Sequence, residues 1–198
     1  IVANRSDPLT IPLTSAVIER VMYRVGEPDL NEFGLRTDKG ERHLCFGTQP
    51  LLPVSALPLL GEHNVANALA VMAMGHAMGL PMERMAKGLI GFGGLPHRCE
   101  RLAEHNGVLW INDSKATNVD ATRAALAGLG GVNNVILIAG GVGKGQDFTS
   151  LTPEASAHCR RVLTLGEDAR QIELALGAHV PVQRVQGYEE AVAAALQC

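Results

Sequence analysis

The chain has 198 residues, 46% of them hydrophobic, so it is long enough for one or two domains with buried cores. Seventeen basic and twenty acidic residues give a net charge of −3, with no run of Lys or Arg. This charge balance argues against nucleic acid or an anionic membrane as the main partner, and no apolar stretch reaches the roughly 18 residues that a membrane span requires.

The four cysteines are not spaced as a redox or metal-binding motif, and no secretion signal precedes them. We therefore expect reduced, mostly buried thiols in a cytoplasmic protein. The seven histidines show no HExxH motif and no ligand spacing, so no metal site made of protein ligands alone is predicted. The chain starts on a residue other than Met and stops within a helical pattern, which is expected for a piece of a longer protein.

The first 60 residues favour short strands with turn residues between them. The predicted strands cover residues 21–25, 32–37 and 43–46. Residues 38–41, read as DKGE, predict a hairpin turn between the last two, because Gly supplies the positive φ that such turns use. Prolines should keep residues 51–60 extended.

Two helices follow. Residues 61–74 are so rich in small apolar side chains that we expect this helix to be covered on nearly all sides, and Pro81 precedes a second helix over 82–90. Asn64 and Asn67 share one face of the first helix. They are either a helix cap and a satisfied buried amide, or a pair that hydrogen-bonds the edge of a heterocycle.

Residues 91–96, read as GFGGLP, resemble a domain hinge, and we place a boundary near Gly94. After it, predicted strands alternate with predicted helices, which favours a parallel sheet with right-handed crossovers. The strands cover residues 108–111, 135–139, 162–165 and 182–185. The helices cover residues 119–129, 151–159, 169–176 and 188–196. The fold class is therefore α/β.

Polar residues follow the apolar run 108–111 directly and lead into a helix. In a parallel α/β sheet, ligands bind beyond the carboxyl ends of the strands, so a binding site is expected here. Asp113 can accept hydrogen bonds from ribose hydroxyls or simply form a turn. Arg98 can clamp a phosphate or form a surface ion pair. Asn118 can cap the helix, so capping accounts for part of this polarity.

Residues 140–145, read as GGVGKG, form neither a P-loop nor a GxGxxG motif. A P-loop would need Gly in place of Ile138 and Ser or Thr in place of Gly145, and GxGxxG would need Gly in place of Gln146. What remains is a glycine loop at a strand end that exposes Lys144, either to a carboxylate or phosphate or to solvent.

Four segments together resemble the Mur ligase family. They are EHNVANALA (62–70), LPHRCE (95–100), INDSKATN (111–118) and AGGVGKGQDF (139–148). The resemblance implies that residues 1–94 end an ATP-binding central domain and that residues 95–198 form most of a Rossmann-like C-terminal domain with a parallel sheet. It implies ATP-driven amide formation through an acyl phosphate, with D-glutamate added to UDP-N-acetylmuramoyl-L-alanine in peptidoglycan synthesis.

The resemblance also assigns roles. Asn64 and Asn67 would lie at the adenine of ATP, Arg98 at its phosphates and Asp113 at its ribose. Lys115, Thr117 and Lys144 would bind D-glutamate, with Arg98 and Lys115 as the catalytic residues. Mg²⁺ would be needed, with ligands mostly outside this chain, and a monomer is expected.

The P-loop of the family is absent from this sequence, so the piece alone is expected to be inactive. Two alternatives stay open. The protein is either another ligase of the superfamily that adds a different amino acid, or a non-catalytic nucleotide-binding module.

Overall fold

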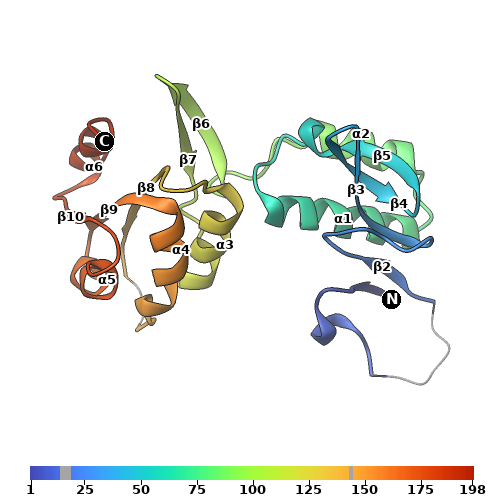
Figure 1. Ribbon diagram of the computed structural model, residues 1–198, viewed down its shortest axis with the longest axis horizontal. Helices are drawn as coiled ribbons and strands as arrows, with labels where there is room; N and C mark the ends of the chain where they lie inside the picture. Colours follow the sequence, from blue (N-terminus) through green and yellow to red (C-terminus); the bar gives the residue numbers. More distant parts are fainter. Residues whose placement is uncertain (14–18, 143–144) are drawn as a thin grey trace. The chain divides into compact units, whose positions relative to one another are not determined.

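The computed structural model describes residues 1–13, 19–142 and 145–198. Its contacts divide the chain into two compact units, Ile1–Leu95 and Pro96–Cys198, which are described separately below (Figure 1). Within the described ranges, no helix is both long and apolar enough to cross a membrane.

The first unit contains a five-stranded sheet in the order β1-β2-β3-β4-β5. The strands are β1 (Val2–Asn4), β2 (Val21–Tyr23), β3 (Glu32–Asp38), β4 (Glu41–Phe46) and β5 (Gln49–Pro53). The first three are parallel and the last three antiparallel. Lys39 and Gly40 join β3 to β4 with φ values of 49° and 85°, so the predicted hairpin turn is confirmed.

The proline-rich stretch after β4 was expected to stay extended, and this is only partly correct. Pro50 and Pro53 lie in β5, which is an edge strand and so tolerates residues that cannot donate a backbone hydrogen bond. The short 3₁₀ helix η2 (Val54–Ala56) then turns the chain. A second short 3₁₀ helix, η1 (Pro8–Thr10), follows β1.

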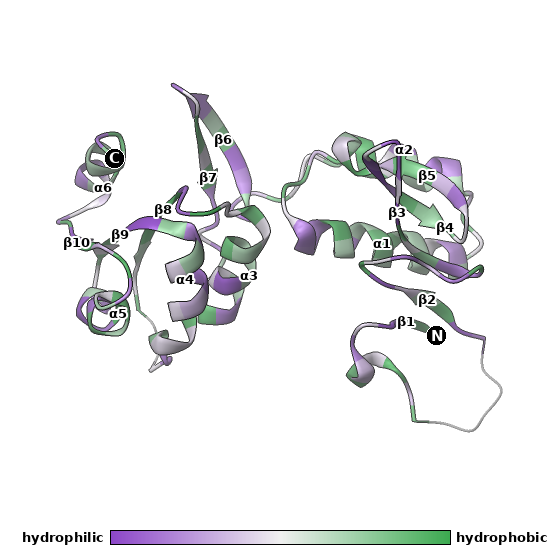
Figure 2. Cartoon of the chain, in the orientation of Figure 1, coloured by the Kyte–Doolittle hydropathy of each residue, from purple (hydrophilic) through white to green (hydrophobic). Residues whose placement is uncertain are grey.

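Helix α1 (Glu62–Ala77) packs on this sheet, and α2 (Met82–Gly91) packs against α1. Leu69 and Met72 of α1 are fully buried with Phe33 and Leu44 of the sheet. Figure 2 shows hydrophobic residues along most of α1. The expectation that α1 is covered on nearly all sides is nevertheless wrong for the described chain. Val71 and Met74 are exposed, and their spacing of three puts them on one face of the helix, away from the buried face.

The second unit contains a parallel sheet in the order β10-β9-β8. The strands are β8 (Val135–Gly140), β9 (Cys159–Leu165) and β10 (Val182–Arg184). The helices are α3 (Val119–Leu129), α4 (Thr152–His158), α5 (Ala169–Leu176) and α6 (Tyr188–Ala195), with the 3₁₀ helix η3 (Phe148–Leu151) before α4. The predicted alternation from β8 onward is confirmed. The core of this unit includes Val162, Ile172 and Leu176.

One predicted strand has different partners from those expected. Residues 108–111 do form a strand, β7 (Val108–Asn112), but it pairs with β6 (Glu100–His105) in a separate antiparallel hairpin (Figure 1). Asn106 and Gly107 form its turn, with φ values of 52° and 76°. Asn-Gly between two strand-like runs is a strong hairpin signal, so this turn was visible in the sequence and was missed.

Candidate functional site

The candidate site lies where the β6–β7 hairpin begins and ends. Glu100, the first residue of β6, pairs with Asn112, the last residue of β7. The chain therefore enters and leaves the hairpin at the same place. The Lys115 backbone N–H donates to the His97 carbonyl (3.0 Å), and the Cys99 backbone N–H donates to Asp113 Oδ1 (3.0 Å). The hairpin thus holds the Arg98 turn against the segment that carries Asp113 and Lys115.

Arg98 is the central residue of a turn with an unusual backbone conformation. His97 before it and Cys99 after it both have left-handed backbones, with φ values of 65° and 45°. Residues with a Cβ rarely adopt this conformation, and it is often found at functional sites. The Arg98 side chain is exposed and forms no hydrogen bond or ion pair with any residue that the structure describes. The surface ion pair considered for Arg98 is therefore not formed there, and its guanidinium is free to bind an anion.

Asp113 is half-buried, and its carboxylate faces Cys99. Its backbone carbonyl accepts from the Ala116 N–H (2.8 Å), so Asp113 also takes part in a turn. Burial raises the pKa of the Cys99 thiol to about 11, and the charge of Asp113 and its hydrogen bond with the thiol add to the effect. A carboxylate beside the thiol disfavours the thiolate.

We expect Cys99 to react slowly with iodoacetamide below pH 9 and faster as pH rises toward its pKa of about 11, because only the thiolate attacks. Asp113→Asn should lower that pKa and increase the labelling rate at a given pH. Cys159 is the matched control, since burial alone raises its pKa to about 11. Mass spectrometry of peptides measures both rates. If the substitution changed the labelling rates of Cys99 and Cys159 equally, Asp113 would not be a cause of the raised pKa of Cys99.

Lys115 and Thr117 lie on the segment between β7 and α3, and both side chains are exposed. Asn118 caps α3, since its Oδ1 accepts from the Ala121 backbone N–H (2.8 Å). The capping predicted for Asn118 is confirmed. Neither Lys115 nor Thr117 uses its side chain in a hydrogen bond with another described residue, so both remain available to a ligand.

Lys144 lies outside the described residues. Gln146, two positions later, attaches the loop after β8 to the candidate site. Its Oε1 accepts from the Val119 N–H (2.8 Å), and its Nε2 donates to the Thr117 carbonyl (3.4 Å). Sequence reasoning used Gln146 only to reject a glycine motif and gave no signal for this role.

Asn64 and Asn67 lie on α1, in the first unit. Gly61, not an asparagine, is the N-cap of α1, so the capping alternative is wrong. Asn64 donates to the Leu60 carbonyl (2.7 Å), and Asn67 donates to Asn64 Oδ1 (3.3 Å). Asn67 is exposed, and its side-chain oxygen forms no hydrogen bond with the described part of the chain.

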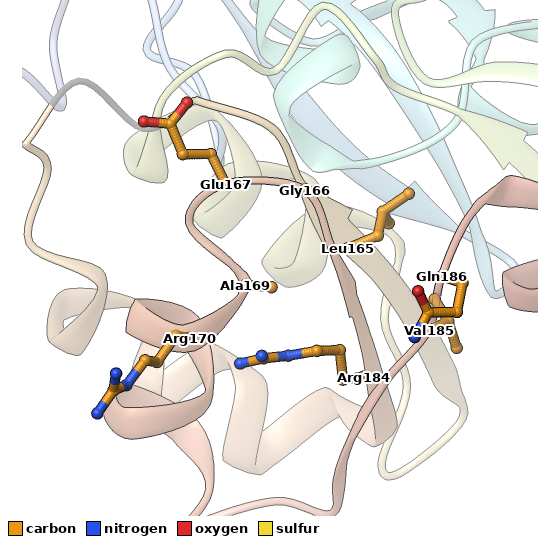
Figure 3. A pocket seen from close by; sticks show the side chains of 8 residues that line it. All are labelled: Leu165, Gly166, Glu167, Ala169, Arg170, Arg184, Val185 and Gln186. Carbon is orange, nitrogen blue, oxygen red and sulfur yellow. The ribbon is translucent and has the colours of Figure 1, made fainter.

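A cavity of about 220 Å³ lies at the carboxyl ends of β9 and β10 (Figure 3). None of the predicted site residues that the structure describes lines it. Arg184 crosses toward α5, where its Nε donates to Glu173 Oε1 (2.7 Å), while Arg170 and Glu167 point outward. The Arg184 guanidinium, which faces the cavity, is therefore already paired with Glu173. No group of three or more His, Cys, Asp or Glu residues that could hold a metal ion occurs among the described residues.

Residues 97–198 match the family described as Mur ligase, glutamate ligase domain. The chain is 46% identical over 194 residues to the UDP-N-acetylmuramoylalanine–D-glutamate ligase of Pseudomonas fluorescens Pf-5, covering 97% of this chain and 43% of that protein. The enzyme of the same name from Nitrosococcus oceani is 49% identical over 170 residues, covering 86% and 38%. The chain thus spans less than half the length of these relatives.

Solved structures share the fold. MurF from Acinetobacter baumannii superimposes with a TM-score of 0.68 at 20% identity, covering 99% of this chain and 44% of that one. A pseudomurein peptide ligase type C from Methanothermus fervidus gives a TM-score of 0.71 at 16% identity, covering 99% and 51%. The predicted α/β class is confirmed by this likeness and by the parallel sheet.

Proposed function

Because this chain belongs to the Mur ligase family, we propose that the full-length protein joins D-glutamate to UDP-N-acetylmuramoyl-L-alanine, using ATP, in peptidoglycan synthesis. The observation that carries the proposal is the 46% identity, over 97% of this chain, to ligases named for that reaction. The gathering of Arg98, Asp113 and Lys115 at one end of the hairpin supports it. Cytoplasmic location and a monomeric state belong to the same proposal.

In this proposal, residues 1–94 form the C-terminal part of the ATP-binding central domain, and residues 95–198 form the C-terminal domain without its end. The family match over residues 97–198 supports the second assignment. In the same proposal, Asn64 and Asn67 contact the adenine of ATP. Arg98 contacts its phosphates, and Asp113 contacts its ribose.

The chemistry proceeds in two steps. An oxygen of the alanyl carboxylate attacks the γ-phosphorus of ATP, ADP leaves, and an acyl phosphate forms. The amine of D-glutamate then attacks the acyl carbon, and inorganic phosphate leaves from the tetrahedral intermediate as the amine loses its proton. Negative charge builds on phosphoryl and carbonyl oxygens in both steps, so positioned cations supply most of the stabilisation.

Arg98 and Lys115 provide those cations in the proposal. The planar guanidinium of Arg98 suits two phosphate oxygens at once, and the ammonium of Lys115 acts as a point charge. Lys115, Thr117 and Lys144 bind the carboxylates of D-glutamate. The described residues do not gather the carboxylates of a magnesium site. In the proposal, Mg²⁺ would be held by ligands mostly outside this chain and would help to stabilise the charge on the phosphoryl oxygens.

The amino-acid specificity of the full-length protein tests the proposal. We expect D-glutamate to support ADP release in the presence of ATP, Mg²⁺ and UDP-N-acetylmuramoyl-L-alanine, and L-lysine, meso-diaminopimelate and L-alanine not to. The isolated 198-residue chain is the negative control, because its sequence has no P-loop. Faster release with another amino acid would indicate a different ligase. ATP binding without any release would indicate a non-catalytic module.

Lys144→Ala in the full-length protein should raise the D-glutamate KM by about tenfold or more, because one charge-assisted hydrogen bond to a carboxylate is lost. The ATP KM should stay within about twofold. Initial rates at varied D-glutamate and varied ATP measure both constants. Equal increases in the two KM values would reject a role for Lys144 in binding D-glutamate.

A further inference from the structure

Three polar side chains surround the turn that carries Arg98. Glu100 Oε2 accepts hydrogen bonds from the His97 backbone N–H (2.9 Å) and from Asn112 Nδ2 (3.4 Å). The same Asn112 Nδ2 lies 2.8 Å from His97 Nδ1. Asn112 thus contacts residues on both sides of Arg98 from its place at the end of β7.

Both polar atoms of the Asn112 side chain take part in hydrogen bonds. Its Oδ1 accepts from the Ser114 backbone N–H (3.1 Å). This bond fixes the orientation of the amide, since a backbone N–H can only donate. The two hydrogens on Nδ2 are then donated to Glu100 and His97. In this arrangement His97 Nδ1 is the acceptor for the Asn112 amide.

The Arg98 turn depends on such support. The left-handed backbones of His97 and Cys99 cost free energy in residues that have a Cβ. They persist only where surrounding bonds hold them. Arg98 itself offers no such bond, since its side chain contacts no described residue through a hydrogen bond or ion pair. The backbone of the turn therefore fixes only the point from which the Arg98 side chain extends.

We propose that Asn112 is a positioning residue that, by tying His97 and Glu100 to the end of β7, holds Arg98 in place for the phosphates of ATP. This inference rests on the proposed function and extends it to a residue that contacts no substrate. When Asn112 cannot donate, the turn can relax, and the point from which the Arg98 side chain extends shifts. The loss should therefore affect ATP and spare D-glutamate.

Asn112→Asp in the full-length protein is the first test. The substitution keeps the shape of the side chain, removes both donated bonds and places a second carboxylate beside Glu100. The ATP KM should rise about tenfold, while the D-glutamate KM stays within about twofold. Asn106→Asp is the matched control, because Asn106 lies in the turn at the far end of the same hairpin. Both of its KM values should be unchanged.

The double variant Glu100→Gln/Asn112→Asp separates positioning from general damage. It exchanges the amide and the carboxylate. The oxygen of the introduced Gln can still accept from the His97 backbone N–H, its amino group can donate to the introduced carboxylate, and His97 can donate from Nδ1 in its other tautomer. The ATP KM should return to within about threefold of the parent value.

Three results would overturn the inference. They are an unchanged ATP KM in Asn112→Asp, an equal increase in both KM values, and a double variant no better than the single one. The activity of the parent enzyme separates a failure of the proposed function from a failure of this inference. If the parent lacks D-glutamate-dependent ADP release, the proposed function fails, whereas the inference fails only through the variants of an active parent.

Discussion

Lys115→Ala in the full-length protein is expected to lower kcat by roughly 10²–10³-fold, the loss typical of removing one group that stabilises a developing oxyanion. The Lys115 backbone N–H donates to His97, and alanine keeps that bond. The side chain is exposed and bonds to no other described residue, so its removal should leave the fold intact. A lower kcat would then show that the Lys115 side chain takes part in the reaction itself.

Steady-state ADP release measures this effect, and the thermal unfolding midpoint shows whether the variant is folded. Lys87→Ala is the matched control, because Lys87 is an exposed lysine on α2 that was assigned no role. It should retain kcat within about twofold. A Lys115→Ala enzyme that is folded and as active as the control would remove Lys115 from the catalytic residues.

Arg98→Ala is the second large effect, with kcat/KM for ATP expected to fall about 100-fold, because a bidentate bond to phosphate is lost from the bound state and the transition state. The kcat/KM for ATP of Arg98→Lys should lie between those of the parent and of Arg98→Ala, because lysine keeps the charge but lacks the planar guanidinium. The D-glutamate KM should change little. Initial rates at varied ATP give the comparison.

Arg101→Ala provides the control from the same hairpin. Arg101 lies three residues after Arg98 on β6, is exposed and pairs with Glu104 at the surface. Surface pairs of this kind contribute little to stability. The Arg101→Ala variant should therefore fold normally and have nearly the same kcat/KM for ATP as the parent. If both arginine variants lost kcat/KM for ATP equally, the effect would reflect the local positive charge and not a phosphate clamp at Arg98.

The helices of the second unit could be predicted because their signals are local. Helix α3 begins after Asn118, whose side chain caps it, and α5 spans the predicted residues 169–176. Both helices have apolar spacing that fits within one window of sequence, and α3 also has a side-chain cap. The strand at 108–111 was also found, but its partners were not, because pairing is a long-range property.

The sequence-based prediction of the candidate site rested partly on a wrong strand pairing. Asp113 and Lys115 were expected at the carboxyl end of a strand in the parallel sheet, whereas β7 pairs only with β6 among the described strands. The hairpin itself brings Arg98 back to Asp113, fourteen residues after Cys99 in the chain. An Asn-Gly turn at 106–107 was the signal that could have shown this.

The support around Arg98 could not be predicted at all. The bonds from Asn112 to His97 and Glu100 require the register of β6 against β7, which the sequence pattern does not specify. The left-handed backbones of His97 and Cys99 likewise have no signal in the local sequence. Neither residue type favours that conformation as glycine does.

The most direct test is a crystal structure of the full-length protein with a non-hydrolysable ATP analogue and D-glutamate. We expect Arg98 to donate to phosphate oxygens, Asp113 to accept from a ribose hydroxyl, and Lys115 and Thr117 to contact the amino acid. A nucleotide bound elsewhere, with all four side chains facing solvent, would contradict the account.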